Sequence, residues 1–257
     1  MGSFEKAFRF TASWEGGFDG NRQASSQPLD DSVAVYGITP KFLYDYLGWS
    51  KSDATSTAKL TAINYAKAAQ IWQQSRWTWF KCAQIQNDDI ATLVFDMAVR
   101  RANAAARWLA SAVGLSESQG TIASGRQGIL PSQATINRIN LLCRYPGSCE
   151  ALYQKIIQTY ISNTNYKEIG LKTRASLPDG IIRRLGSLLV VDFNISKDTF
   201  PSLPKAKQTS IKNKVLTVRS SAIAGTAQAT GSSEQATGHW LLWGVTVFVG
   251  GKFLKWW

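Results

Sequence analysis

The stretch Trp14-Glu15-Gly16-Gly17-Phe18 ends an amphipathic helix that the sequence predicts from about residue 3 to residue 15. Apolar side chains recur at helical spacing along one face of it: Phe4, Phe8 and Ala12. Two glycines after the last periodic residue are the usual signal for a helix end. At that end the helix dipole and packing beside Trp14 both disfavour the anion of Glu15. We therefore expect a raised pKa for Glu15, which suits a general acid.

The polar loop that follows, residues 16–35, is rich in Gly, Asn, Ser and Asp. A loop of this length within a compact domain is usually functional. It ends at Tyr36-Gly37-Ile38-Thr39-Pro40, where Thr39 is placed to cap a helix that has Pro40 at its first position. The simpler alternative is that Glu15 is a solvated helix-end residue and that its glycines serve only as a C-cap.

The composition restricts the chemistry open to this chain. Its 257 residues suffice for one large domain or two small ones. The single histidine, His239, lies near the C-terminus, which excludes most metal sites and every histidine-based nucleophilic mechanism elsewhere. We expect no metal and no cofactor, so a hydrolase of this sequence would use carboxylates. Cys143 and Cys149 either pair across the short turn between them or stay free as buried thiols.

The formal net charge of +12 favours an anionic partner: nucleic acid, anionic lipid or an acidic cell-wall polymer. The basic residues are spread along the chain, and neither a Cys/His finger nor a basic heptad motif accompanies them. We expect no specific nucleic-acid binding. A basic helical nucleic-acid-binding protein is an alternative that the charge alone supports.

Helical periodicity dominates the middle of the chain, so the expected fold class is mainly α. A polar passage at 116–128 reads as a boundary between two regions. The pattern predicts helices at 60–76, 88–113, 131–142, 148–162 and 178–191.

The C-terminal part has two unlike pieces. Residues 193–238 begin with a basic stretch and become rich in Ala, Gly, Ser and Thr, which predicts a flexible linker. The uncharged run that follows is short for a bilayer span of about twenty apolar residues, but Lys252 and Lys255 can snorkel and let it reach the last residue. Trp at both ends is typical of a membrane interface. We expect the hydrophobic tail, 239–257, to associate with a membrane; a packed core segment is the alternative.

Four segments in the first half resemble a known family in the same order. They are Trp14-Glu15-Gly16-Gly17-Phe18, Tyr36-Gly37-Ile38-Thr39, the helix around 68–77 and the helix around 94–109. The matching signatures are the E-G-G-aromatic, G-I-T, A-x-x-I-Y…Y-W and V-F-D-x-A-V-N motifs of glycoside hydrolase family 108. Arg76-Trp77 falls on the Y-W pair. These enzymes are N-acetylmuramidases of bacteriophages and bacteria, related in fold to the phage lysozymes.

The resemblance continues more weakly into the second half. Gly128 to Thr135 and Gly180 to Arg184 are similar to parts of the small peptidoglycan-binding-type domain usually attached. The resemblance thus implies a lysozyme-like catalytic domain over 1–115 and a helical peptidoglycan-binding-type region over 116–192.

The resemblance implies that Glu15 is the catalytic acid, but the second catalytic group does not carry over. The family usually has an Asp about nine positions after the Glu, where this chain has Ala24. The family's Gly-Gly-x-Thr is also lost, and its Thr falls on Ala34. The candidates for the second carboxylate are Asp30 and Asp31, of which Asp30 is preferred by position.

The expected function is therefore an N-acetylmuramidase that cleaves the β-1,4 bond of bacterial peptidoglycan. Substrate-binding roles are assigned to Tyr36, Thr39 and Trp77, with core packing as the alternative for the two aromatics. The architecture suggests a phage lysis enzyme or a virion enzyme that opens the wall at infection, located in the virion or the bacterial envelope and acting in the periplasm.

The expected partners are peptidoglycan, a membrane through the tail, and other virion proteins. The main alternative to a hydrolase is a catalytically decayed wall-binding or membrane scaffold protein, which the lost Gly-Gly-x-Thr motivates.

Overall fold

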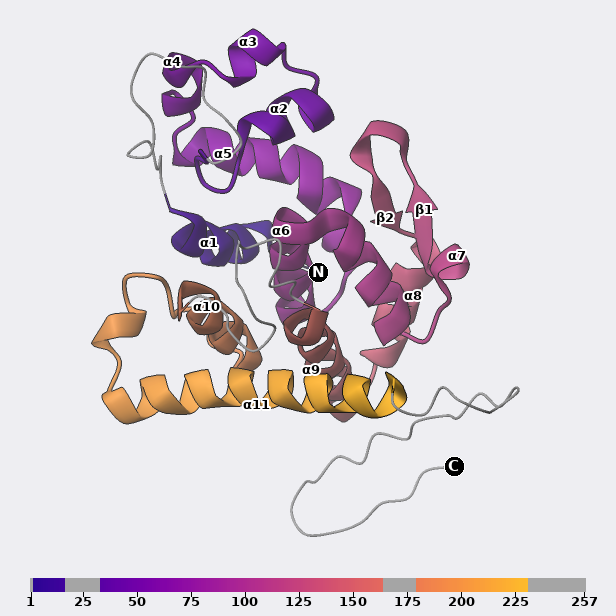
Figure 1. The fold of residues 1–257 in the computed structure, drawn as a ribbon. Coiled ribbons are helices and arrows are strands. Elements are labelled where there is room, and N and C mark those ends of the chain that lie inside the picture. Colours follow the sequence, from indigo (N-terminus) through magenta and orange to yellow (C-terminus); the bar gives the residue numbers. More distant parts are fainter. Residues whose placement is uncertain (1, 17–32, 164–178, 231–257) are drawn as a thin grey trace.

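The computed structural model describes residues 2–16, 33–163 and 179–230, with side chains as far as residue 221. Within these ranges the chain is mainly helical, with one small antiparallel hairpin (Figure 1). The expected fold class is thereby confirmed. Among the described helices none combines the length and the apolar composition that a bilayer crossing requires. The predicted membrane tail, 239–257, lies outside the described residues.

Two helices form the centre of the fold. Helix α1 (Phe4–Glu15) begins at Ser3, whose hydroxyl accepts a hydrogen bond from the Lys6 backbone amide at 3.3 Å. Helix α6 (Asp88–Ala112) runs through the middle of the molecule and contacts α1 directly (Figure 1). Its first half, from Ile90 to Ala98, is buried throughout. A helix that is apolar all round is buried on every side, and α6 accordingly organises the core.

Four short helices form a lobe over α1 and α6 in Figure 1: α2 (Pro40–Leu47), α3 (Lys51–Ala54), α4 (Thr57–Thr61) and α5 (Tyr65–Trp72). The single helix predicted at 60–76 is wrong, because the chain leaves α4 and restarts at Asn64. The Asn64 side chain accepts a hydrogen bond from the Lys67 amide at 2.9 Å and so caps α5. A π-helical turn, Gln73–Trp77, extends α5.

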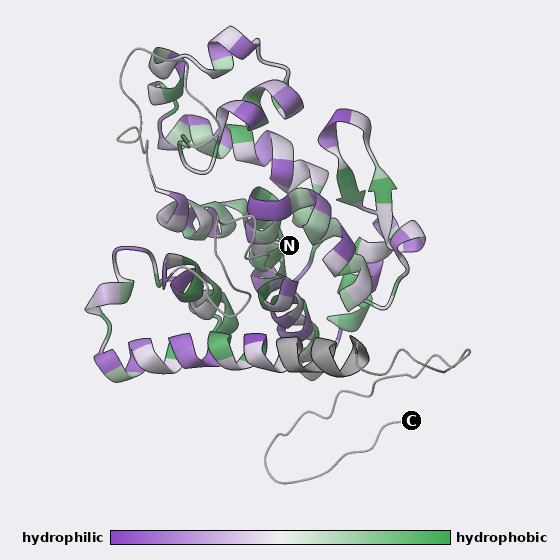
Figure 2. Cartoon of the chain, viewed as in Figure 1, coloured by the Kyte–Doolittle hydropathy of each residue, from purple (hydrophilic) through white to green (hydrophobic). Residues whose placement is uncertain are grey.

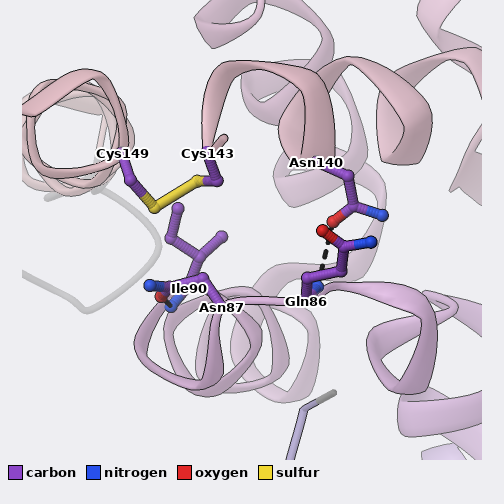
Figure 3. Close-up of a disulfide and its surroundings, with 6 residues drawn as sticks. All are labelled: Gln86, Asn87, Ile90, Asn140, Cys143 and Cys149. Atoms are coloured by element: carbon purple, nitrogen blue, oxygen red, sulfur yellow. Dashed lines mark hydrogen bonds between the residues drawn. A yellow bond between two sulfur atoms is a disulfide. The ribbon is translucent and has the colours of Figure 1, made fainter. Parts of the chain in front are cut away.

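The predicted boundary at 116–128 contains ordered structure. It holds α7 (Glu117–Gly120) and strand β1 (Thr121–Ala123), which pairs antiparallel with β2 (Ile129–Pro131). Helices α8 (Gln133–Leu142) and α9 (Pro146–Asn163) follow, close to the predicted positions. A disulfide joins Cys143 at the end of α8 to Cys149 in α9 (Figure 3). The pairing of these cysteines is therefore the alternative that holds.

The linker predicted at 193–238 is wrong over much of its length. After α10 (Asp179–Leu189) the chain forms α11 (Lys205–Thr230), which lies along α9 and α10 (Figure 1). Ile211 and Val215 are buried against this layer, and the Arg219 guanidinium donates to the Ile161 carbonyl oxygen at 3.2 Å. Figure 2 shows the coloured part of α11, up to residue 221, as mostly hydrophilic, so its narrow apolar seam gave little sequence signal.

Substitutions at the contact between α10 and α11 test whether α11 packs on α10. A Cβ on Gly186 would approach the Ile211 side chain to 2.3 Å, whereas a Cβ on Gly180 in the same helix meets nothing. We predict that Gly186→Leu lowers the free energy of unfolding by about 1–3 kcal/mol through overpacking. Gly180→Leu, the matched control, should leave it unchanged or slightly raise it. Urea denaturation measures both; equal stability of the two variants would contradict packing of α11 on α10.

Candidate active site

A tight turn brings the loop exit against the end of α1. Val35 and Ile38 form a two-way backbone bridge at 3.0 and 2.9 Å, and the turn residues Tyr36 and Gly37 have φ of 50° and 77°. Positive φ at both central positions is the geometry of a type I′ turn. The Tyr36 amide donates to the Gly16 carbonyl oxygen at 2.9 Å, which fixes the turn to the α1 C-terminus.

The geometry at position 37 requires a glycine. Its φ is one that side chains rarely adopt, and a Cβ there would lie 3.1 Å from Cγ of Glu15. The turn therefore lies directly on the Glu15 side chain and restricts where its carboxylate can point. The Trp72 indole nitrogen donates to the Tyr36 carbonyl oxygen at 2.9 Å and holds the turn from the α5 side.

On its other side Glu15 binds a buried arginine. Arg184 of α10 is 5% exposed and donates through Nη1 to Oε1 of Glu15. Its Nη2 and Nε donate to Oδ1 of Asp96 at 2.5 and 3.1 Å, and Asp96 is completely buried in α6. The Thr11 hydroxyl also donates to that oxygen at 3.2 Å. One guanidinium thus links α10 to α1 and α6.

The electrostatics of Glu15 differ from the expectation. Burial raises its pKa. The charges of Arg184 and Arg100 and the hydrogen bond from Arg184 together lower it by more than burial raises it, so the pKa of Glu15 is lowered overall. The raised pKa predicted for Glu15 is therefore wrong for this state of the protein. The helix-end argument failed because an arginine distant in sequence outweighs the helix dipole. Glu15 is a carboxylate at neutral pH.

The Glu15 side chain is 23% exposed and lines a cleft of about 360 Å³. The walls come from the turn, from α2 and α5, and from α6 near Arg101, whose backbone is non-helical. Among the charged side chains that line the cleft in the described structure, cations outnumber carboxylates, since Glu15 supplies the one carboxylate. The other described residues that line the cleft are Ala34, Gly37, Thr39, Lys41, Phe42, Tyr46, Trp72, Arg76, Val99 and Arg100.

The remaining predicted site residues have different positions. Thr39 lines the cleft while its hydroxyl caps α2 by accepting from the Phe42 amide at 3.1 Å. Trp77 is 4% exposed and packs edge-on against Phe4 and Phe95, so its predicted substrate-binding role is wrong and it belongs to the core. Tyr36 is partly exposed, edge-on to Tyr65 at 5.8 Å, and its substrate role stays a prediction. The predicted carboxylates, Asp30 and Asp31, lie outside the described residues.

Sequence reasoning gave no functional role to three arginines around the site: Arg76, Arg100 and Arg184. The signal for Arg184 was available, because an arginine on the apolar face of an amphipathic helix needs a buried partner. Its partners could not be identified from the sequence, since Glu15 and Asp96 lie far from Arg184 along the chain.

Comparisons with known proteins agree with this geometry. The family model described as glycosyl hydrolase 108 matches residues 8–101, the segment that contains Glu15 and every described residue of the cleft lining. This confirms the resemblance to glycoside hydrolase family 108 and supports a glycoside hydrolase.

A solved structure of SagA from Brucella abortus has a similar fold, with a TM-score of 0.51 and 18% sequence identity. The similarity covers 76% of this chain and 97% of that one, so the shared fold extends past the family segment. The comparison with curated proteins found no match.

The Arg184 contacts yield a stability prediction. Arg184→Met leaves the buried Asp96 carboxylate without its cation, which should lower the free energy of unfolding by about 3–5 kcal/mol. Arg107→Met is the matched control, because Arg107 makes a surface ion pair with Glu117 and its loss should cost about 1 kcal/mol or less. Thermal and urea denaturation compare them. Similar losses for the two variants would contradict a central role for Arg184.

Proposed function

We propose that this chain, which carries a glycosyl hydrolase 108 segment, is a peptidoglycan hydrolase that acts as an N-acetylmuramidase. The observation that carries the proposal is the position of Glu15 within that segment. Its carboxylate ends α1, contacts Gly37 of the turn, and lines a cleft with walls from three further elements. A carboxyl group in a cleft supplies one of the two carboxyl groups that glycoside hydrolysis requires.

In the proposed reaction Glu15 protonates the oxygen of the β-1,4 bond as its general acid. Glycoside hydrolysis also needs a second, ionised carboxylate that activates water or stabilises the oxocarbenium-like transition state. Glu15 is the one carboxylate among the described residues of the cleft. The second therefore comes in this proposal from the loop, with Asp30 preferred over Asp31.

The lowered pKa of Glu15 sets a condition for this role. A sugar bound over Glu15 removes its remaining water contact, and desolvation favours the neutral acid over the anion. Burial is already the largest influence on this carboxyl group and acts in that direction. Substrate binding thus opposes the arginine charges and helps Glu15 to take up the proton that it later donates.

The decayed scaffold is a second candidate, and one observation favours it. Ala34 lines the cleft at the position to which the family motif assigns a threonine, so no hydroxyl is present there. A scaffold of this kind would bind walls without cutting them. Purified peptidoglycan separates the two candidates, since a hydrolase clears the suspension and a scaffold only pellets with it.

The setting proposed is the bacterial envelope, for a phage lysis enzyme or a virion enzyme that opens the wall at infection. The disulfide between Cys143 and Cys149 supports an oxidising compartment such as the periplasm, because disulfides persist there and are rare in the cytosol. The net charge of +12 supports attraction to the anionic wall. Membrane association through the tail and contacts with other virion proteins belong to the same proposal.

Replacement of Glu15 tests the proposed function directly. Glu15→Gln keeps the side-chain size but cannot donate the proton, so we predict loss of peptidoglycan clearing by at least about 100-fold, the range of general acid catalysis. Glu117→Gln is the control, since Glu117 pairs with Arg107 on the surface. Turbidity of purified walls is the measurement, and circular dichroism checks folding. Clearing by a folded Glu15→Gln protein would refute the assignment.

The pH profile tests the electrostatic argument. A general acid must be protonated, so kcat/KM falls as pH rises through the pKa of Glu15, and the lowered pKa places that fall in the acidic range. The double variant Asp96→Asn/Arg184→Gln removes the buried charges together and leaves a neutral hydrogen-bonding pair. We predict that its alkaline limb moves to higher pH. An unmoved limb in the folded double variant would show that Arg184 does not set this pKa.

A further inference from the structure

Arg76 is a buried cation in the wall of the cleft. Its side chain is 5% exposed, and three aromatic rings surround the guanidinium carbon: Phe42 at 5.0 Å, Tyr46 at 4.7 Å and Trp79 at 5.1 Å. Within the described structure its Nε and Nη1 are buried and make no hydrogen bond. Two unsatisfied donors on a buried charge are unfavourable, so packing alone does not explain an arginine here.

The guanidinium stays charged despite this environment. Burial lowers the pKa of Arg76 to about 10, and Tyr46 acts against that shift by its charge interaction and hydrogen bond. Cation–π contacts compensate for part of the lost hydration. A tyrosine, which the Y-W motif has at this position, would pack among the same rings without a buried charge.

The charge of the cleft indicates what Arg76 binds. Glu15 is neutralised by Arg184, and Lys41 forms an ion pair with Asp45 at 2.6 Å. Arg76 and Arg100 line the same cleft, and neither forms an ion pair within the described residues. A guanidinium presents paired N–H donors that match the two oxygens of a carboxylate. A phosphate would fit the same donors, but the anionic groups of the proposed peptidoglycan substrate are carboxylates, so a carboxylate is the ligand that we assign to this wall.

We propose that Arg76, together with Arg100, forms a subsite for the carboxylate carried by the muramyl residue of the substrate. This inference rests on the proposed function. N-acetylmuramic acid differs from N-acetylglucosamine by a lactyl ether, which ends in a free carboxylate or in an amide to a peptide that has carboxylates of its own. The subsite makes the muramyl residue the one that the cleft recognises.

Tyr46 lies beside the Arg76 guanidinium in the wall of the cleft. It is partly exposed, lines the cleft, and hydrogen-bonds the guanidinium, whose Nε and Nη1 are buried. A carboxylate forms stronger, charge-assisted hydrogen bonds to a guanidinium than a neutral phenol does. In this proposal a carboxylate therefore replaces the Tyr46 hydroxyl as the hydrogen-bond acceptor of the guanidinium.

The first test compares three substrates. They are glycan strands without peptides, peptide-bearing peptidoglycan, and N-acetylglucosamine oligomers, which have no carboxylate. Arg76→Met should lower kcat/KM by about 10- to 100-fold on a carboxylated substrate, the range expected for lost charge-assisted hydrogen bonds, and leave the oligomers unchanged. A loss confined to peptide-free strands assigns the lactyl carboxylate, and one confined to peptidoglycan assigns the peptide. An equal loss on all three substrates, or no loss, overturns the proposal.

Two controls accompany this comparison. Arg107→Met removes a surface guanidinium that does not line the cleft and should change none of the three rates. The melting temperature of Arg76→Met should stay constant or rise, because the variant removes a buried charge from an aromatic surrounding. Arg76→Lys keeps the charge and should retain part of the preference for the carboxylated substrate.

The second test measures binding and is independent of hydrolysis. Calorimetry with N-acetylmuramic acid and N-acetylglucosamine should show tighter binding of the acid to the wild-type protein and equal affinities for Arg76→Met. Equal affinities in the wild-type protein overturn the subsite. Arg76-dependent binding of the acid without clearing of any wall would retain the subsite and reject the muramidase, whereas clearing without an Arg76 effect would do the reverse.

Discussion

The Arg184 guanidinium is the interaction on which the rest of the site depends. It occupies a position where three helices meet, and it pairs with a carboxylate that is completely buried in α6 and with another at the end of α1. Without it the Asp96 carboxylate would be buried with no cation beside it, and Glu15 would lose its closest positive charge, an arrangement that is strongly disfavoured. The same contact that holds α10 on the central helices thus sets the charge state of the candidate catalytic group.

This arrangement connects the two regions that the sequence suggested as separate. Arg184 lies in the predicted peptidoglycan-binding-type region, and Glu15 lies in the predicted catalytic one. Helix α11 packs against α9 and α10 and so completes the layer that supports Arg184. The candidate active site consequently depends on residues outside the segment that matches the family, and the extent of the fold similarity to SagA agrees with a unit larger than that segment.

The cleft itself combines one carboxylate with several cations among its described residues. Glu15 forms its ion pair with Arg184, and neither Arg76 nor Arg100 forms one among the described residues, so the proposal assigns these two arginines to the ligand. Aromatic rings around Arg76 hold the guanidinium in place and keep water from it. In the proposed function, catalysis and recognition therefore use opposite charges within one small cleft.

The sequence by itself determined the local features. Spacing and capping signals predicted α1, α6, α8, α9 and α10, together with the Thr39 cap and the position of Glu15 at a helix end, because these depend on neighbours within a few residues. It misplaced α4 and α5 as one helix and α11 as a linker, since Asn64 capping was overlooked and the apolar seam of α11 is narrow.

Only the tertiary structure decided the charge of Glu15, the burial of Trp77 and the roles of Arg76 and Arg184. Each depends on residues that are distant in sequence and that folding alone brings within hydrogen-bonding or packing distance.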